Sequence, residues 1–558
     1  MRASFIAAAC ALALCVPGYA RPDTPHPSGQ DGKSDYADLA SLFEAWRVFQ
    51  APEIHGGVPD YSAAAMARKA AALPGWKQRL ASIRTAGWNA EQRNDYRLVE
   101  AEMNGLDFEL RVLRPWARDP AFYVQVWASR TDVPLREGPA AQPEIALHAY
   151  EFPLSRADQA TLTAQLRAIP ALLAQARANL KDSNAGDLWR YSPRMLRDQA
   201  EALTQLEAGT LIISKLDGSR KADMTGAGGA LRQAINAART ATDGFIEWVE
   251  TVAPGKTGPS GVGRDEYSWY QRNVHFSPYD WNEEMALLRR ELERAHAALK
   301  LEEHRNRDLP PLAPVTDEAT FQALSNRRLD AFVAFLVREQ IIPDKPYLRT
   351  AIAPQIGHFV PEPQRAFFAQ VTHREPMLLF SHDYHWIDLA RMRDEPHPSP
   401  IRRGASLSNI WDGRAEGFAT AFEELMMQAG LYDDNPRARE LVWIMLANRA
   451  ARGLASLHVQ ANEWSLEQAG RFHADWTPRG WAKAGDDLTA FEQLLYLRQP
   501  GYGTSYITGK LMLERLIADA AHRSERAGKP FVLRAFLDSF NKAGMIPIPL
   551  IADEMLPN

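Results

Sequence analysis

Apolar residues recur three and four positions apart along most of this 558-residue chain, which is the pattern of helices that bury one face. In the first half, this pattern predicts helices over residues 36–47, 63–85, 89–113, 161–180, 191–213, 226–252 and 282–301. Pro74 and Gly75 are expected to split the second of these helices in two. Few segments alternate as strands do, so the sequence predicts a mainly α-helical fold with little strand.

A polar, proline-containing connector at residues 302–315 leads into a second helical region. There the pattern predicts helices over 316–339, over 441–457 and from about 505, and short strands over 351–354 and 357–360. Asn435 and Pro436 have the residue types of a helix cap and a first helical position. We therefore expect helical regions at 36–301 and 316–558, an arrangement that also allows one continuous domain.

The amino terminus has the form of a secretory signal peptide, with one basic residue, a short apolar run, and small residues before a cleavage point at Ala20. Residues 1–20 are therefore expected to be removed, and the polar residues 21–35 are expected to form a disordered leader. This predicts a periplasmic or secreted protein without a stable membrane anchor. Lipid attachment at Cys15 is the less favoured alternative, because Leu14 rather than a small residue precedes it.

Composition narrows the chemistry that the mature chain can carry. Both cysteines lie in the predicted signal peptide, so a metal site would have to use histidine and carboxylate ligands. The formal net charge of −5 offers no basic surface for nucleic acid. We therefore expect a peptide or another small molecule as the partner.

One short stretch concentrates side chains that bind metals: His382, Asp383, His385 and Asp388. On a helix, residues three apart share a face, so the two histidines and Asp388 would lie together. A pair with this spacing can bind one metal, as in the metal sites of helical bundles. The spacing typical of zinc peptidases, two histidines four apart with a glutamate after the first, does not occur here.

Two further acids, Glu416 and Glu423, are seven residues apart and so two turns apart on one face of a predicted helix. Their neighbours are mostly small or apolar, which indicates that the carboxylates are buried. A buried acid is neutralised, paired or bound to a metal. Arg402, Arg403 and Arg414 are candidates for pairing, so a structural salt bridge and a metal or catalytic role both stay open.

Arginines and tyrosines further along the chain are candidates for binding a substrate. Arg449 and Arg452 lie on an apolar helix, where they could pair with the acids or bind a substrate carboxylate. Tyr502 and Tyr506 follow a glycine-rich turn and could donate hydrogen bonds to an oxyanion, although tight packing explains such a turn equally well.

Three segments carry a resemblance to a known family. Glu416-Gly-Phe-Ala-Thr-Ala-Phe-Glu423 resembles the Glu-Gly-Trp-Ala-x-Tyr-x-Glu motif of the bacterial family DUF885, and residues 463–469 and 500–506 are similar to two later motifs of that family. The resemblance covers about residues 36–550. It implies a large, mostly helical, zincin-like architecture and metallopeptidase activity, with Glu416 as a metal ligand and Tyr506 as a site residue.

The chain departs from the family's hallmark, His-Glu-x-x-Pro-Gly-His-His-Leu-Gln. The ungapped match places His382 and Asp383 on the His-Glu pair, and it places Asp388 and Leu389 on the two later histidines. Asp388 could still bind a metal, whereas Leu389 could not. A gapped match would recruit His385 as the second histidine instead.

These observations lead to three hypotheses. The first is an exported, metal-dependent hydrolase of the peptidase type, and the second is a non-catalytic periplasmic binding protein on the same scaffold. A hydrolase that uses Asp388 and Glu416 without a metal is the third. In the first, zinc or another divalent metal binds His382, Glu416 and either His385 or Asp388. The other predicted roles are general base for Asp383 or Glu423, oxyanion binding for Tyr506, and substrate binding for Arg449 and Tyr502.

Overall fold

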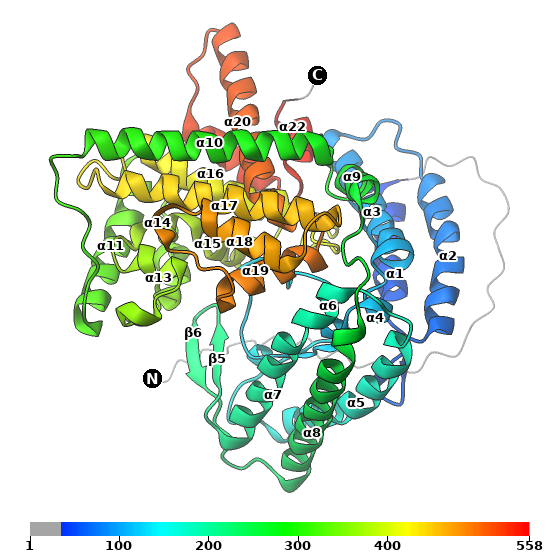
Figure 1. Cartoon of the computed structure of the whole chain (residues 1–558). Coiled ribbons are helices and arrows are strands. Elements are labelled where there is room, and N and C mark those ends of the chain that lie inside the picture. Colours follow the sequence, from blue (N-terminus) through cyan, green and yellow to red (C-terminus); the bar gives the residue numbers. More distant parts are fainter. Residues whose placement is uncertain (1–34, 557–558) are drawn as a thin grey trace, which may run out of the picture.

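The computed structural model describes residues 35–556, and within them the chain is mainly α-helical (Figure 1). The predicted signal peptide and all of the predicted leader except Asp35 lie outside the described residues. Strands in the described part form only two-stranded pairs. None of the helices in this part combines the length and apolar character that crossing a membrane requires.

The first half of the described chain contains ten α-helices and the strands. The helices are α1 (Tyr36–Gln50), α2 (Ala63–Ala81), α3 (Ala90–Phe108), α4 (Pro115–Arg118), α5 (Arg156–Leu180), α6 (Gly186–Tyr191), α7 (Pro193–Ala208), α8 (Gly229–Val252), α9 (Arg264–Asn273) and α10 (Trp281–Arg305). The strands are β1 (Ile54–His55), β2 (Val58–Pro59), β3 (Val126–Trp127), β4 (Ile145–Ala146), β5 (Ile212–Lys215) and β6 (Gly218–Lys221). The β3–β4 pair is parallel, and the other two pairs are antiparallel.

The second half contains helices joined by loops, and no strands among its described residues. Its helices are α11 (Glu318–Arg338), α12 (Tyr347–Ile352), α13 (Phe367–Thr372), α14 (Met377–His382), α15 (Tyr384–Asp394), α16 (Asp412–Gln428), α17 (Ala438–Gln460), α18 (Leu466–Trp476), α19 (Asp487–Arg498), α20 (Tyr502–Arg526), α21 (Leu533–Lys542) and α22 (Ile548–Met555). Side-chain caps fix several starts, including Asp35 before α1, Asp280 before α10 and Asp317 before α11.

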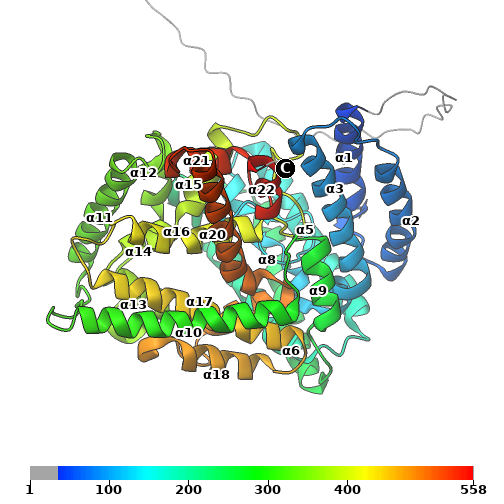
Figure 2. The same ribbon diagram turned by 90° about the horizontal axis from the view of Figure 1, so that it is seen from above.

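These helices pack around two large hydrophobic cores. One core is shared by α1–α3, α9 and α10 with most of the second half, and α10 packs along α17 (Figures 1 and 2). The other core is built by α5, α7 and α8, which form the cyan and green lower part of Figure 1. The loop between β3 and β4 belongs to this second part, yet it reaches the first, where the candidate site lies.

Four local predictions were wrong. Asn435 does not cap a helix: its side chain donates to Glu375, and α17 begins at Ala438 without a side-chain cap. The helix over 63–85 does not split, because α2 continues through Pro74 while Leu73 and Leu80 keep it packed on the core. The helix predicted over 191–213 ends at Ala208, since Gly209 adopts a left-handed φ of 64° and β5 follows. Residues 351–354 and 357–360 form no strands; the first of these ranges continues α12 into a helical turn.

Candidate metal centre

The two candidate histidines lie on either side of a break between two short helices. α14 ends at His382, and α15 begins at Tyr384, because Asp383 leaves the helical conformation at φ −63° and ψ 6°. His385 therefore lies in the first turn of α15. The break brings the two imidazole rings to a centroid distance of 4.9 Å, at 90° to one another.

Helix α16 brings Glu416 to these histidines, and glycines allow it to cross α20 at close range. A methyl group at Gly417 would overlap the backbone of Gly509, and one at Gly509 would overlap the carbonyl oxygen of Gly413. The glycine that follows Glu416 therefore permits a helix contact that no larger residue would allow. The same contact brings Tyr502, at the start of α20, beside Glu416.

His382, His385 and Glu416 form a buried group that could hold a metal ion, with one ligand atom from each residue and all three atoms within 4.8 Å of one another. Nε2 of His385 lies 3.2 Å from Oε2 of Glu416, and Nε2 of His382 lies 3.7 Å from the same oxygen. The side chains of His385 and Glu416 are 2% and 4% exposed. A group so shielded from water needs a partner for each polar atom.

The central atoms of this group contact mainly one another. Tyr502 donates its hydroxyl proton to Oε1 of Glu416. Among the described residues, Oε2 of Glu416 and Nε2 of His385 have no polar partner closer than each other, at 3.2 Å. Two imidazole nitrogens and one carboxylate oxygen form a donor set that catalytic zinc sites use. These residues therefore fit a divalent metal.

His385 and Glu416 each stabilise the charged form of the other. Burial alone would lower the pKa of His385, but the Glu416 carboxylate outweighs it and raises that pKa to about 9. Burial would raise the pKa of Glu416, but the His385 cation lowers it to about 2. Without a metal, the pair is thus a carboxylate beside an imidazolium. A metal cation would take the place of the imidazolium proton.

Glu423 and Arg449 both contact Nδ1 of His382. Both terminal nitrogens of Arg449 donate to Glu423, each at 2.7 Å, and Nη2 of Arg449 also lies 3.0 Å from Nδ1 of His382. Oε1 of Glu423 is 3.2 Å from the same Nδ1. A carboxylate at the second nitrogen of a metal-binding histidine fixes the ring and the tautomer. Glu423 lies at this nitrogen together with the Arg449 guanidinium, which can only donate, so the Arg449 contact requires an unprotonated Nδ1 and the Glu423 contact a protonated one.

Asp388 lies outside the three-residue group. Its carboxylate forms ion pairs with Arg391 at 2.7 Å and with Arg414 at 3.1 Å. Asp388 is three residues from His385 on α15, but its side chain pairs with these arginines and does not join the candidate metal group. Arg414 is fully buried and also donates to Asn541 at 2.9 Å, which anchors α16 to α21.

The two tyrosines and Arg452 border the same site. The ring of Tyr506 stacks on His382 at a centroid distance of 6.3 Å, and the Arg452 guanidinium lies over it at 4.3 Å. Arg452 itself pairs with Glu492. Arg449 and Arg452 are thus both paired with glutamates. Pairing with acids is one of the two roles that the sequence leaves open for these arginines; the other is binding a substrate carboxylate.

Two acids of the site were missed by the sequence analysis: Asp132 and Glu137, on the loop between β3 and β4. Oε1 of Glu137 lies 3.4 Å from the Tyr502 hydroxyl, which also bonds Glu416. Burial and the charge of Asp132 raise the pKa of Glu137 to about 7. Burial raises the pKa of Asp132 too; the Glu416 charge adds to this effect and the His385 charge opposes it. One sequence signal could have indicated them: both acids lie in a long segment without a predicted helix, residues 119–155, and long loops are often functional.

The fold and the buried histidine–carboxylate group define a large helical protein with a candidate metal centre, and the sequence identifies its family. The family of bacterial proteins of unknown function, DUF885, matches residues 48–353 and 385–555. The chain belongs to this family. His382 and Asp383 lie between the two matched segments.

Solved structures confirm the fold. A candidate lipoprotein of unknown function from Shewanella oneidensis superposes with a TM-score of 0.65 at 14% identity, covering 94% of this chain and 100% of that one. A candidate lipoprotein from Colwellia psychrerythraea gives a TM-score of 0.61 at 13% identity, covering 94% of this chain and 99% of that one. No curated protein matches the sequence.

Proposed function

We propose that the protein is a metal-dependent hydrolase of the peptidase type, in which His382, His385 and Glu416 bind one divalent metal such as zinc. The observation that carries this proposal is the placement of three ligand atoms within 4.8 Å of one another, two of them buried and contacting mainly each other. These two atoms have mainly each other as partners, at 3.2 Å, and a metal between them would bind both.

A divalent metal supplies Lewis acidity, which polarises the carbonyl group of a peptide bond. The chain's own residues supply orientation and proton transfer. Arg449 and Glu423 hold the His382 ring, and Tyr506 beside that ring donates a hydrogen bond to the oxyanion of the substrate. We assign proton transfer to Asp383, because both oxygens of Glu423 are engaged by Arg449.

The metal content of the purified mature protein tests this proposal. We expect near-stoichiometric metal by mass spectrometry, with loss of the metal in His385→Ala. A second, exposed cluster of Glu53, His55 and Asp60 could also attract a cation, so His55→Ala is the matched control and should keep the metal. A metal-free wild type, or unchanged metal in His385→Ala, would overturn the assignment of the site.

A peptide-library digest tests the activity separately. We expect cleavage that a chelator abolishes and that added metal restores. Protein that keeps its metal but cleaves no peptide would favour the alternative, a non-catalytic binding protein. Peptide binding that persists after chelation would favour the same alternative.

We also propose that the protein works outside the cytoplasm. The predicted signal peptide supports this location, and the two solved relatives are described as candidate lipoproteins. Cell fractionation with a tagged chain tests it, and a Cys15→Ser variant distinguishes a lipid-anchored form from a freely released one. Protein found only in the cytoplasmic fraction would refute the proposal.

A further inference from the structure

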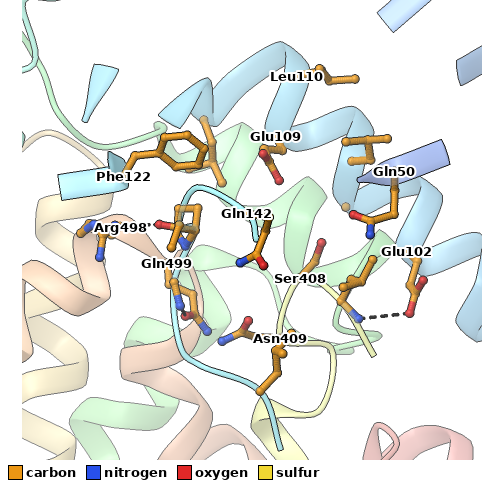
Figure 3. Close-up of a pocket in the computed structure, with 18 of the residues that line it drawn as sticks. Gln50, Glu102, Glu109, Leu110, Phe122, Gln142, Ser408, Asn409, Arg498 and Gln499 are labelled. Carbon is orange, nitrogen blue, oxygen red and sulfur yellow. Dashed lines mark hydrogen bonds between the residues drawn. The ribbon is translucent and has the colours of Figure 1, made fainter. Parts of the chain in front are cut away.

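A cavity of about 280 Å³ lies on the far side of the β3–β4 loop from the metal centre. Leu135, Arg136 and Gly138 of that loop line the cavity, whereas Glu137 between them contacts Tyr502 at the metal centre. The opposite wall is formed by α1, α3 and the turn at Ser408 (Figure 3). The two parts of the protein thus enclose the space jointly.

Glu109 is a charged residue of this wall for which no partner is found among the described residues. It begins the π-helical turn Glu109–Leu113 that follows α3, and Figure 3 shows its carboxylate pointing into the space. The carboxylate forms no hydrogen bond or ion pair with the described residues, although the charge of Lys69 acts on it from a distance. π-helical turns are frequent at functional sites.

The other charged groups around the cavity each have a partner, including Glu144, which forms an ion pair with Arg136 at 3.6 Å. Lys69 donates to the carbonyl oxygens of Gln50 and Ala51 at 2.7 and 2.9 Å. Glu102 is bound by Arg47 and Trp46, Arg498 is bound to Asp119 at 2.6 Å, and Arg136 donates to the Ser129 carbonyl at 2.8 Å. A carboxylate in a cavity whose neighbours are all paired is a ready counter-ion for a ligand cation.

Asn409, at the lower wall in Figure 3, offers a donor that also lacks a partner. Its side chain is buried, and its Nδ2 atom has no hydrogen-bond partner among the described residues. Ser408 and Asn409 both adopt left-handed φ values, 54° and 51°. Such strain in two consecutive residues is typical of binding sites and persists because the surroundings hold it. Here Ser408 packs directly on Gly105 of α3.

We propose that this cavity binds a small organic ammonium compound that also carries a carbonyl oxygen, such as an amino acid amide or the amino-terminal residue of a peptide. Glu109 is the counter-ion of the ammonium group, and the amides of Asn409 and Gln142 bind the oxygen. Leu106 and Phe122 supply apolar wall for a side chain. The site is separate from the metal centre, and its occupation does not depend on the proposed hydrolase activity.

Calorimetric titration of the full mature protein with L-leucinamide tests the proposal, and N-acetyl-L-leucinamide is the control ligand without an ammonium group. We expect binding of L-leucinamide alone, weakened about tenfold or more in Glu109→Gln, because a hydrogen-bonded charge is lost while the shape is kept. Asp107→Asn makes the same change two residues away, outside the cavity, and should leave binding unchanged. Leu106→Trp, which fills the cavity, should abolish it.

The metal-centre variant His385→Ala separates this site from the active site. Binding that survives in His385→Ala and falls in Glu109→Gln supports the cavity. Binding that falls in His385→Ala and survives in Glu109→Gln would place the ligand at the metal centre and overturn the proposal. Equal binding of the acetylated control, or no detectable binding of L-leucinamide, would overturn it as well. Circular dichroism melts of each variant show whether a loss of binding reflects unfolding.

Discussion

The buried pair of Arg449 and Glu423 allows a quantitative test of how His382 is held. We consider Arg449→Met, which removes the guanidinium but keeps most of the apolar stem. In the wild type, the two side chains share two hydrogen bonds of 2.7 Å, and they are only 1% and 2% exposed. The substitution leaves a carboxylate enclosed by protein without its cation.

Removing one partner of a buried ion pair typically costs about 3–5 kcal/mol, because the remaining charge has lost both its partner and its water. We expect a loss of this size in the free energy of unfolding of Arg449→Met. The double variant Arg449→Met/Glu423→Leu should recover much of it, since no buried charge remains. Metal affinity should nevertheless stay low in the double variant, because His382 has lost the carboxylate at Nδ1.

Urea denaturation of metal-free protein measures the first effect, and competition with a chromogenic chelator measures the second. The control is Arg349→Met: Arg349 pairs with Asp330 at 2.7 Å, but the side chains are 46% and 60% exposed. Exposed pairs contribute about 0.2–1 kcal/mol, so this variant should hardly change stability. A loss in Arg449→Met no larger than in Arg349→Met would refute the reasoning.

Three further predictions follow from the same contacts. Tyr502→Phe removes the hydroxyl that orients Glu416, so we expect metal affinity to fall about 10–100-fold in the chelator competition. Gly417→Ala places a methyl group against Gly509, so urea denaturation should give a loss of about 1–3 kcal/mol in unfolding free energy. Burial raises the pKa of Glu109 from 4.5 to about 7, and the charged form therefore destabilises the fold. Glu109→Gln should then be more stable than wild type by about 3 kcal/mol above pH 7, with the gain disappearing as pH falls to 4.5.

Each of these three predictions has a control. Tyr279→Phe alters a half-buried tyrosine away from the centre and should keep metal affinity unchanged. Gly404→Ala faces open space, so it should leave stability within about 0.5 kcal/mol of wild type. Asp107→Asn, near Glu109 but paired with Lys77 on the surface, should show no comparable pH-dependent gain. A Glu109→Gln gain that is the same at pH 4.5 and pH 8 would contradict the assignment of a raised pKa.

Local sequence signals predicted the helices well, because amphipathic periodicity and caps act within a few residues. The helices predicted from 316 and from 282 begin at Glu318 and Trp281, each after an aspartate cap. The register of the site was harder to predict. Spacing placed His382, His385 and Asp388 on one helical face, but this inference assumes an unbroken helix. The break at Asp383 shows that this assumption is wrong. In addition, Asp388 pairs with Arg414, which lies 26 residues further along the chain.

The charge around the centre was beyond sequence reasoning, because it depends on chain segments that meet only in the fold. Asp132 and Glu137 come from the second hydrophobic part, yet they lie beside Glu416 and raise the number of acids there. Asp412 lies one turn before Glu416, fully buried, with one oxygen bonded to Gln499 and the other without a partner. Burial raises the pKa of all three of these acids. Carboxylates gathered out of water must be protonated or face a cation. Their raised pKa values favour the protonated forms of the three acids, and a divalent cation at the histidines would stabilise the charged forms instead, which supports the proposed metal site.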